Sequence, residues 1–249
     1  MILELDMGNS RAKWRVLDEA AGTVAQGVVD TVDWFDRPLP EAWTEGVSRI
    51  RVASVLAAET ERRLTARLRT ELSVEVEYAR PTAVCAGVTC AYASPEHLGV
   101  DRWLALLAAF RRCGAAAMVV DVGTALKVDV VDDAGLHLGG YIIPGAALME
   151  RALFDGTDRV RYTEGAPLAS VELGTDTRAC VQHGVAASLV GAVMLAIAQV
   201  RAAVGRVPAL YMSGGQGARL GQHLLGAGVK ADIRLEADLV LDGLRLALP

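Results

Sequence analysis

Two short motifs in this chain place an aspartate, a glycine and small polar residues between strand-like runs. The first is LELDMGNSRAKW, with Asp6, Gly8 and Asn9, and the second is VVDVGTALKV, with Asp121 and Gly123. A glycine close after the aspartate lets the backbone approach a ligand and offer N–H groups, as in turns that bind phosphate. An aspartate repels phosphate, so it belongs beside such a turn when a cation lies between them.

These aspartates fit two different roles. Mg²⁺ is held by one or two carboxylates together with substrate phosphates, so Asp6 and Asp121, with Lys13 nearby, form a candidate metal and nucleotide site. Alternatively, each aspartate caps its own hairpin turn. The motif occurs twice, with Asn9 matching Thr124, and this favours the first role without excluding the second.

A third acidic position lies in SPEHLGVDRWLALLAAF, where Asp101 and Arg102 precede an apolar helical run. Asp101 is well placed to cap this helix and to stabilise its N-terminus. The same pair also suits catalysis, because an aspartate can accept a proton from a substrate hydroxyl while a guanidinium holds an anionic group. The residues alone leave these two interpretations equal.

Each half of the chain continues from its motif into further strands and then helices. The predicted strands of the first half are 2–7, 12–17, 23–30 and 50–54, before an amphipathic helix at 58–72. In the second half we expect strands at 117–122, 126–132 and 136–142, helices at 146–153 and 176–203, a strand over ALYMSG and a helix after GGQGARL.

The separation of about 115 residues between the motifs indicates a duplicated α/β domain. We therefore predict domains at 1–115 and 116–249, with a cleft between them.

Composition excludes several classes of protein. A net charge of −5, a pI near 5.4 and scattered arginines argue against nucleic-acid binding. The uncharged stretch 185–200 has 16 residues, fewer than the roughly 20 of a spanning helix, which predicts a buried helix of a soluble protein. The N-terminus has no basic segment of a signal peptide, so we expect a cytoplasmic protein. Cys85, Cys90, Cys113 and Cys180 lack metal-site spacing and are predicted to be buried thiols.

Taken together and in order, DMGNSRAKW, HLGVDRW, DVGTA, GGYIIPG, GTDT and SGG resemble the type III pantothenate kinases. These kinases are members of the acetate and sugar kinase/Hsp70/actin superfamily, and the resemblance covers nearly the full length of the chain. It implies a homodimer of duplicated ribonuclease H-like domains with the actin-like ATPase fold. It also implies ATP-dependent phosphorylation of pantothenate, the first committed step of coenzyme A synthesis.

The resemblance also implies roles for individual residues of this chain. The first nucleotide-binding loop would consist of Asp6, Met7, Gly8, Asn9, Ser10, Arg11, Ala12 and Lys13, with Asp6 near Mg²⁺ and the phosphates. Thr124, Gly214 and Gly215 would contact ATP, and Asp121 would ligate an activating potassium or ammonium ion. Asp101 would be the general base, and pantothenate would be bound by Tyr92, Gly99, Val100, Asp101, Arg102 and Thr177.

Lys127 departs from the family pattern, which usually has threonine there. An unpaired buried ammonium would cost several kcal/mol, so we expect Lys127 to be paired or exposed. Its ammonium could replace the monovalent cation near Asp121 and Asp129, contact an ATP phosphate, or point outward to pair with Asp129 or solvent. Alternation along the strand places residues 127 and 129 on one face.

Two milder departures concern the substrate side, because Asp176 replaces a common asparagine and Val100 a small alanine. Two functional alternatives remain open at this point. One is a kinase of the superfamily with another small hydroxylated substrate, and the other is a catalytically weakened regulatory or accessory protein.

Overall fold

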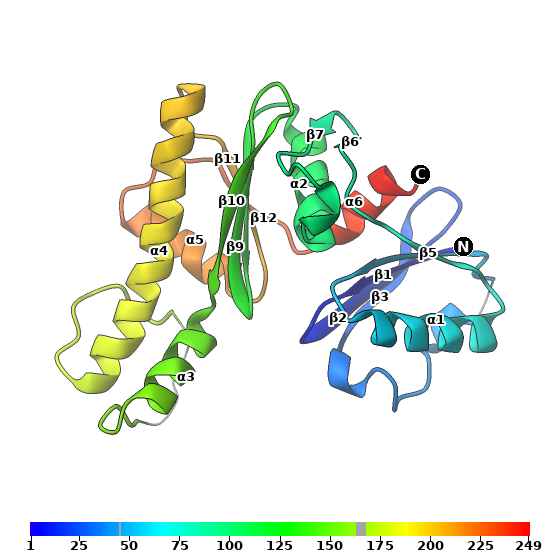
Figure 1. Cartoon of the computed structure of the whole chain (residues 1–249), viewed down its shortest axis with the longest axis horizontal. Helices are drawn as coiled ribbons and strands as arrows, with labels where there is room; N and C mark the ends of the chain where they lie inside the picture. Colours follow the sequence, from blue (N-terminus) through cyan, green and yellow to red (C-terminus); the bar gives the residue numbers. More distant parts are fainter. Residues whose placement is uncertain (45, 163–167) are drawn as a thin grey trace. The chain divides into compact units, whose positions relative to one another are not determined.

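The computed structural model describes residues 1–44, 46–162 and 168–249. The chain forms two compact units, Met1–Ala108 with Leu239–Pro249, and Ala109–Asp238 (Figure 1). Each unit contains a five-stranded sheet, ordered β3-β2-β1-β4-β5 in the first and β10-β9-β8-β11-β12 in the second. The order third, second, first, fourth, fifth is the same in both sheets, so the predicted duplication of an α/β domain is confirmed.

The first unit begins with an antiparallel meander and continues with parallel strands. Its elements up to the start of the connecting helix are β1 (Ile2–Met7), β2 (Arg11–Leu17), β3 (Thr23–Asp30), η1 (Thr31–Asp33), η2 (Glu41–Trp43), β4 (Arg49–Ser54), α1 (Ala58–Leu72), β5 (Val76–Tyr78), β6 (Val84–Cys85), β7 (Val88–Thr89) and η3 (Pro95–His97). Every second residue of β1 is buried in a core that includes Leu3, Leu5 and Leu64 of α1. The intervening residues Glu4 and Asp6 therefore face the other side of the sheet.

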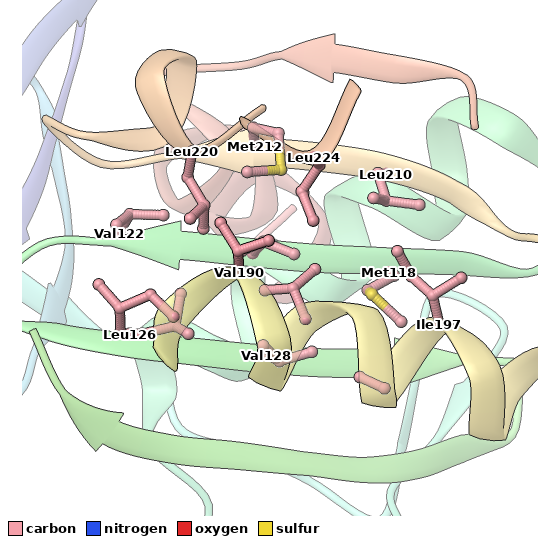
Figure 2. Close-up of a cluster of buried hydrophobic side chains, with 14 of the residues drawn as sticks. Met118, Val122, Leu126, Val128, Val190, Ile197, Leu210, Met212, Leu220 and Leu224 are labelled. Atoms are coloured by element: carbon pink, nitrogen blue, oxygen red, sulfur yellow. The ribbon is translucent and has the colours of Figure 1, made fainter. Parts of the chain in front are cut away.

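The second unit repeats this plan. After α2 (Val100–Cys113) come β8 (Ala117–Val122), β9 (Ala125–Val131), β10 (His137–Pro144), α3 (Ala146–Gly156), α4 (Thr177–Val204), β11 (Ala209–Ser213), α5 (Gly217–Gly226) and β12 (Ile233–Leu235). The last helix, α6 (Leu239–Ala247), returns to the first unit. Figure 2 shows side chains of β8 and β9 meeting α4 and α5 in one core, among them Val122, Val128, Val190 and Leu224. This core covers one face of the sheet, so Asp121 and Lys127, which alternate with the buried residues, lie on the other face.

Among the described residues, α4 is the one helix long and apolar enough to cross a membrane by length and composition. Its most apolar 18-residue window has a mean hydropathy of 1.8, and 44% of that window is buried inside the protein. The buried stripe of α4, which includes Val185, Leu189 and Val193, packs against the sheet. This packing agrees with the sequence prediction of a buried helix at 185–200, although Met194 (39%) and Leu195 (55%) within that range are exposed.

The compact units differ from the predicted ranges at two places. The boundary falls inside α2, after Ala108, and residues 239–249 belong to the first unit because α6 packs against β1 and β4. A buried ionic network strengthens that packing, since Arg15 bonds both Glu4 (2.7 Å) and Asp242 of α6 (2.7 Å).

The cysteine prediction is wrong in part, because none of the four is fully buried. Cys180 is exposed, and Cys85, Cys90 and Cys113 are half-buried. Cys180 lies in the first turns of α4, where its Sγ donates to the carbonyl of Gly174 (3.3 Å).

Candidate active site

The first Asp-x-Gly motif forms the turn between β1 and β2. Asp6 pairs in register with Lys13, and the next pair, Met7 with Ala12, is followed by the turn Gly8–Arg11. The N–H of Gly8 donates to the carbonyl of Arg11 (3.1 Å), which closes the turn. Asp6 and Lys13 are half-buried and Asn9 and Ser10 are exposed, whereas Met7 and Ala12 are buried in the core. Only backbone atoms of the last two can therefore meet a ligand.

A residue outside the motif holds this turn in place. The hydroxyl of Thr31, in η1, donates to the carbonyl of Gly8 (2.7 Å), and its N–H donates to the carbonyl of Ser10 (3.0 Å). Sequence reasoning missed Thr31, because it follows β3 and nothing in its neighbourhood resembles a ligand-binding motif.

The proposed base and anion-binding residues meet at the start of α2. Arg102 is 7% exposed, and its guanidinium donates to the hydroxyl of Tyr92 (3.1 Å). Asp101 lies in the first turn of the helix and is half-buried. A Cβ atom on Gly99 would lie 2.8 Å from Oδ1 of Asp101, so glycine leaves room for this carboxylate. The fold thus brings together Tyr92, Gly99, Asp101 and Arg102, while the side chain of Val100 is buried.

The second Asp-x-Gly motif forms the turn between β8 and β9. Asp121 pairs in register with Lys127, and Val122 pairs with Leu126 just before the turn Gly123–Ala125. The N–H of Gly123 donates to the carbonyl of Ala125 (3.0 Å). Thr124 is exposed at the tip of the turn, as a residue that contacts a nucleotide must be.

Two glycine segments of the same unit approach this turn closely. The N–H of Gly145, at the start of α3, donates to the carbonyl of Thr124 (2.9 Å), and a Cβ on Gly145 would lie only 2.2 Å from the carbonyl oxygen of Gly123. Gly214 has φ +78°, and a Cβ there would lie 2.6 Å from Oδ1 of Asp121. Gly145 is a second residue that sequence reasoning missed, although the motif GGYIIPG ends on it and could have indicated it.

Lys127 pairs across the two strands. Its Nζ lies 3.0 Å from Oδ2 of Asp121, with 27% of the lysine side chain and 33% of the aspartate side chain exposed. Asp129, on the same face of β9, bonds Nε2 of the buried His137 (3.2 Å). This contact joins the ammonium to Asp121, the carboxylate named in the first of the three sequence-based alternatives.

The remaining predicted site residues lie outside the two turns. Gly215, next to Gly214, is exposed before α5. Thr177 is the first residue of α4 and is exposed, and Asp176 before it caps the helix by accepting from the N–H of Ala179 (2.9 Å). Their roles toward ATP and pantothenate stay predictions.

No group of three or more His, Cys, Asp or Glu side chains within residues 1–44, 46–162 and 168–249 is arranged to hold a metal ion. Mg²⁺ in proteins is typically held by one or two carboxylates together with substrate phosphates. The half-buried carboxylate of Asp6, beside the turn Gly8–Arg11, is of this kind. An inorganic monovalent cation at Asp121 fits less well, since the Lys127 ammonium already lies against that carboxylate.

Comparison with known structures supports the fold. A crystal structure of a candidate Baf family transcriptional activator from Campylobacter jejuni superposes with a TM-score of 0.62 at 20% identity, covering 98% of this chain and 95% of that chain. A candidate 2-dehydro-3-deoxygalactonokinase from Sinorhizobium meliloti gives 0.59 at 14% identity, over 99% of this chain and 98% of that chain. Both share the arrangement of elements, and at these identities they show the fold alone.

Comparison with known sequences is more specific. The family model of type III pantothenate kinase matches residues 2–199. Type III pantothenate kinases from Pseudomonas aeruginosa strain LESB58 and Pseudomonas syringae pv. syringae strain B728a are 37% and 38% identical to this chain, covering 100% of it and 99% of each relative. The chain therefore belongs to the type III pantothenate kinase family.

Proposed function

We propose that this protein transfers the γ-phosphoryl group of ATP to the hydroxyl of pantothenate, with Asp101 as the general base. The observation that carries the proposal is the cluster at the start of α2, where Asp101 lies beside the buried, Tyr92-bonded guanidinium of Arg102. Pantothenate carries both a hydroxyl and a carboxylate, so it needs a proton acceptor and an anion-binding group. Arginine supplies the second through charge-assisted hydrogen bonds.

The two turns have a different task in this mechanism. Phosphoryl transfer depends on positioning and on neutralisation of charge more than on covalent catalysis. Backbone N–H groups of Gly8–Arg11 and the side chains of Asn9, Ser10 and Lys13 would bind phosphates, and Thr124, Gly214 and Gly215 would contact the nucleotide. Asp6 would hold Mg²⁺, which supplies further neutralisation of the phosphates. Asp101 accepts the hydroxyl proton as the new O–P bond forms.

The proposal includes a homodimer in the cytoplasm. The face of α4 away from the core exposes apolar residues, among them Met194 (39%) and Leu195 (55%), together with Gly191. Apolar side chains gathered on an exposed helix face are typical of an interface. Sedimentation of wild type and of Leu195→Glu tests this, because the substitution should convert dimer to monomer.

The experiment for the catalytic proposal is a steady-state assay of ADP release with MgATP and pantothenate. Asp101→Asn should lower kcat by about 10² to 10⁴-fold, as expected for loss of a general base. Glu96→Gln, an exposed carboxylate in the neighbouring η3, is the matched control and should keep the wild-type rate. Folded wild-type protein that releases no ADP in the presence of pantothenate would defeat the proposal. The regulatory alternative gains no support, since both turns and the Asp101–Arg102 pair are intact.

A further inference from the structure

Lys127 places a fixed positive charge beside the second turn. Its ammonium lies 3.0 Å from Oδ2 of Asp121, and the two residues are direct partners across β8 and β9. One residue pair, Val122 with Leu126, separates them from the turn Gly123–Ala125. Both side chains are partly exposed, so the pair lies at the surface of its sheet and can reach a bound ligand.

The first unit has the same residue types at the same place. Asp6 and Lys13 are direct partners across β1 and β2, and the pair Met7 with Ala12 separates them from the turn Gly8–Arg11. An aspartate and a lysine thus occur one residue pair before each turn. Lys13 and Lys127 occupy the same position in the two halves, so a lysine at this position belongs to the strand–turn–strand motif of this chain.

The carboxylate of Asp121 already has a cation beside it. Its Oδ2 is engaged by the Lys127 ammonium at 3.0 Å. A metal ion near Oδ2 would meet the ammonium at close range. Two positive charges at such a short distance repel each other.

We propose that the ammonium of Lys127 is a tethered cation that makes this enzyme independent of inorganic monovalent cations. The inference rests on the proposed kinase function, for which the family resemblance implies that Asp121 would ligate the cation. A charge that is covalently attached is present at every turnover, so the activity does not vary with potassium or ammonium concentration. Asp121 keeps its role as the anionic partner that fixes the cation beside the turn.

The test compares wild type with three variants in two buffers, one with potassium and one whose only monovalent cation is tetramethylammonium. Lys127→Thr removes the ammonium and opens space, Lys127→Met removes the charge but keeps the bulk of the stem, and Lys230→Thr is the control. Lys230 is exposed, in the same unit, between α5 and β12. The activity assay is accompanied by thallium(I) NMR on unliganded protein, with thallium(I) as the probe for potassium, and by thermal melts.

We expect wild type and Lys230→Thr to be equally active in both buffers and to bind no thallium(I). Lys127→Thr should lose about tenfold or more of its activity without potassium, as for a lost charge-assisted bond, regain it with potassium, and bind thallium(I). Lys127→Met should have low activity in both buffers, because the methionine side chain carries no charge and fills the space that a potassium ion would need.

Two results would overturn the inference: potassium dependence or thallium(I) binding in wild type, or a normally melting Lys127→Thr that neither binds thallium(I) nor responds to potassium. If wild type fails to phosphorylate pantothenate in either buffer, the proposed function fails separately, and thallium(I) binding alone decides the cation site.

Discussion

On the face of each sheet opposite its core, the two sheets agree at the residue pair closest to the turn and differ at the next pair on that face. Asp6–Lys13 and Asp121–Lys127 are equivalent, but two residues further from the turn the first sheet has Glu4 opposite Arg15 and the second has Val119 opposite Asp129. Glu4 is fully buried and bonds Arg15 (2.7 Å) and Arg51 (3.1 Å). Asp129 is buried and bonds His137 instead.

This comparison separates two kinds of charged residue. The aspartate–lysine pair is repeated in both halves, lies near a turn and is partly exposed, as the proposed contact with a ligand requires. Buried charges that differ between the halves each have a local protein partner, so they contribute to the stability of their own sheet.

The largest effect is expected from Glu4→Gln. The substitution leaves the buried guanidinium of Arg51 without its carboxylate partner and weakens the tie between β2 and α6 through Arg15. Breaking a buried ion pair by removing one partner costs about 3–5 kcal/mol, which should appear as a lower free energy of unfolding in urea titrations. Because this network lies away from the turn, the folded fraction of the variant should keep its kcat. A loss of kcat with unchanged stability would show that the distinction between the two pairs is wrong.

Asp6→Asn should have the next largest effect, and on activity. Loss of the carboxylate proposed to hold Mg²⁺ should lower kcat/KM by about 10²-fold, since a bound metal contributes several kcal/mol to charge stabilisation. Asp121→Asn should lower kcat/KM by only about tenfold, which corresponds to the loss of one charge-assisted hydrogen bond, because the Lys127 ammonium remains. Steady-state kinetics at varied Mg²⁺ measures both, and equal losses in the two variants would contradict the assignment of different cations to the two turns.

Asp129→Asn is expected to have a smaller effect, on stability. An amide oxygen can still accept a hydrogen bond from His137, so only the charge is lost and the free energy of unfolding should fall by about 1 kcal/mol. Urea unfolding with turnover measured in parallel checks this. Complete loss of turnover at wild-type stability would place Asp129 in the active site. It would then be wrong to group Asp129 with Glu4 as a buried charge that acts only in stability.

The smallest effect concerns pH and the outer edge of each sheet. Hydrogen bonds from Arg49 lower the pKa of Glu77 below its ordinary value of 4.5, so this pair stabilises the protein above that value and less so as pH falls through the lowered pKa. Both side chains are partly exposed, which limits the contribution to about 1 kcal/mol or less. In the second sheet Arg234 bonds both the carboxylate of Asp232 (2.6 Å) and the hydroxyl of Tyr211 (2.8 Å), and burial raises the pKa of Tyr211.

Thermal melts of wild type and Glu77→Gln from pH 7 down to about pH 3 measure the difference. The two proteins should differ near neutrality and converge in acid. A gap that widens as pH falls would contradict the lowered pKa.

Much of the fold could be predicted because the long strands alternate clearly. Ile2–Met7 and Ala117–Val122 are predicted to the residue, since apolar side chains recur at every second position or fill the run. Short elements such as β12, with three residues, carry too little pattern to be read. The sequence could not assign α6 to the first unit, because the ion pair that holds this helix joins Asp242 to Arg15, 227 residues away in the chain.

Contacts between strands in the candidate site were likewise beyond what the sequence could predict. Alternation correctly placed Lys127 and Asp129 on one face, but the described partner of Lys127 is Asp121, on the neighbouring strand. Directly opposed residues on paired strands lie about 4.5–5.5 Å apart at Cβ, closer than residues i and i+2 of one strand. The register that sets such a pair depends on the turn, and the two turns of this chain differ by one residue, Gly8–Arg11 against Gly123–Ala125.

Phosphorus NMR tests the kinase assignment and the role of Lys127 together, on wild-type protein with MgATP and pantothenate in tetramethylammonium buffer free of potassium and ammonium. We expect a new phosphomonoester resonance that grows in step with ADP. No phosphomonoester in this buffer or after addition of potassium would contradict the kinase assignment, and a resonance that appears only after addition of potassium would contradict the role of Lys127.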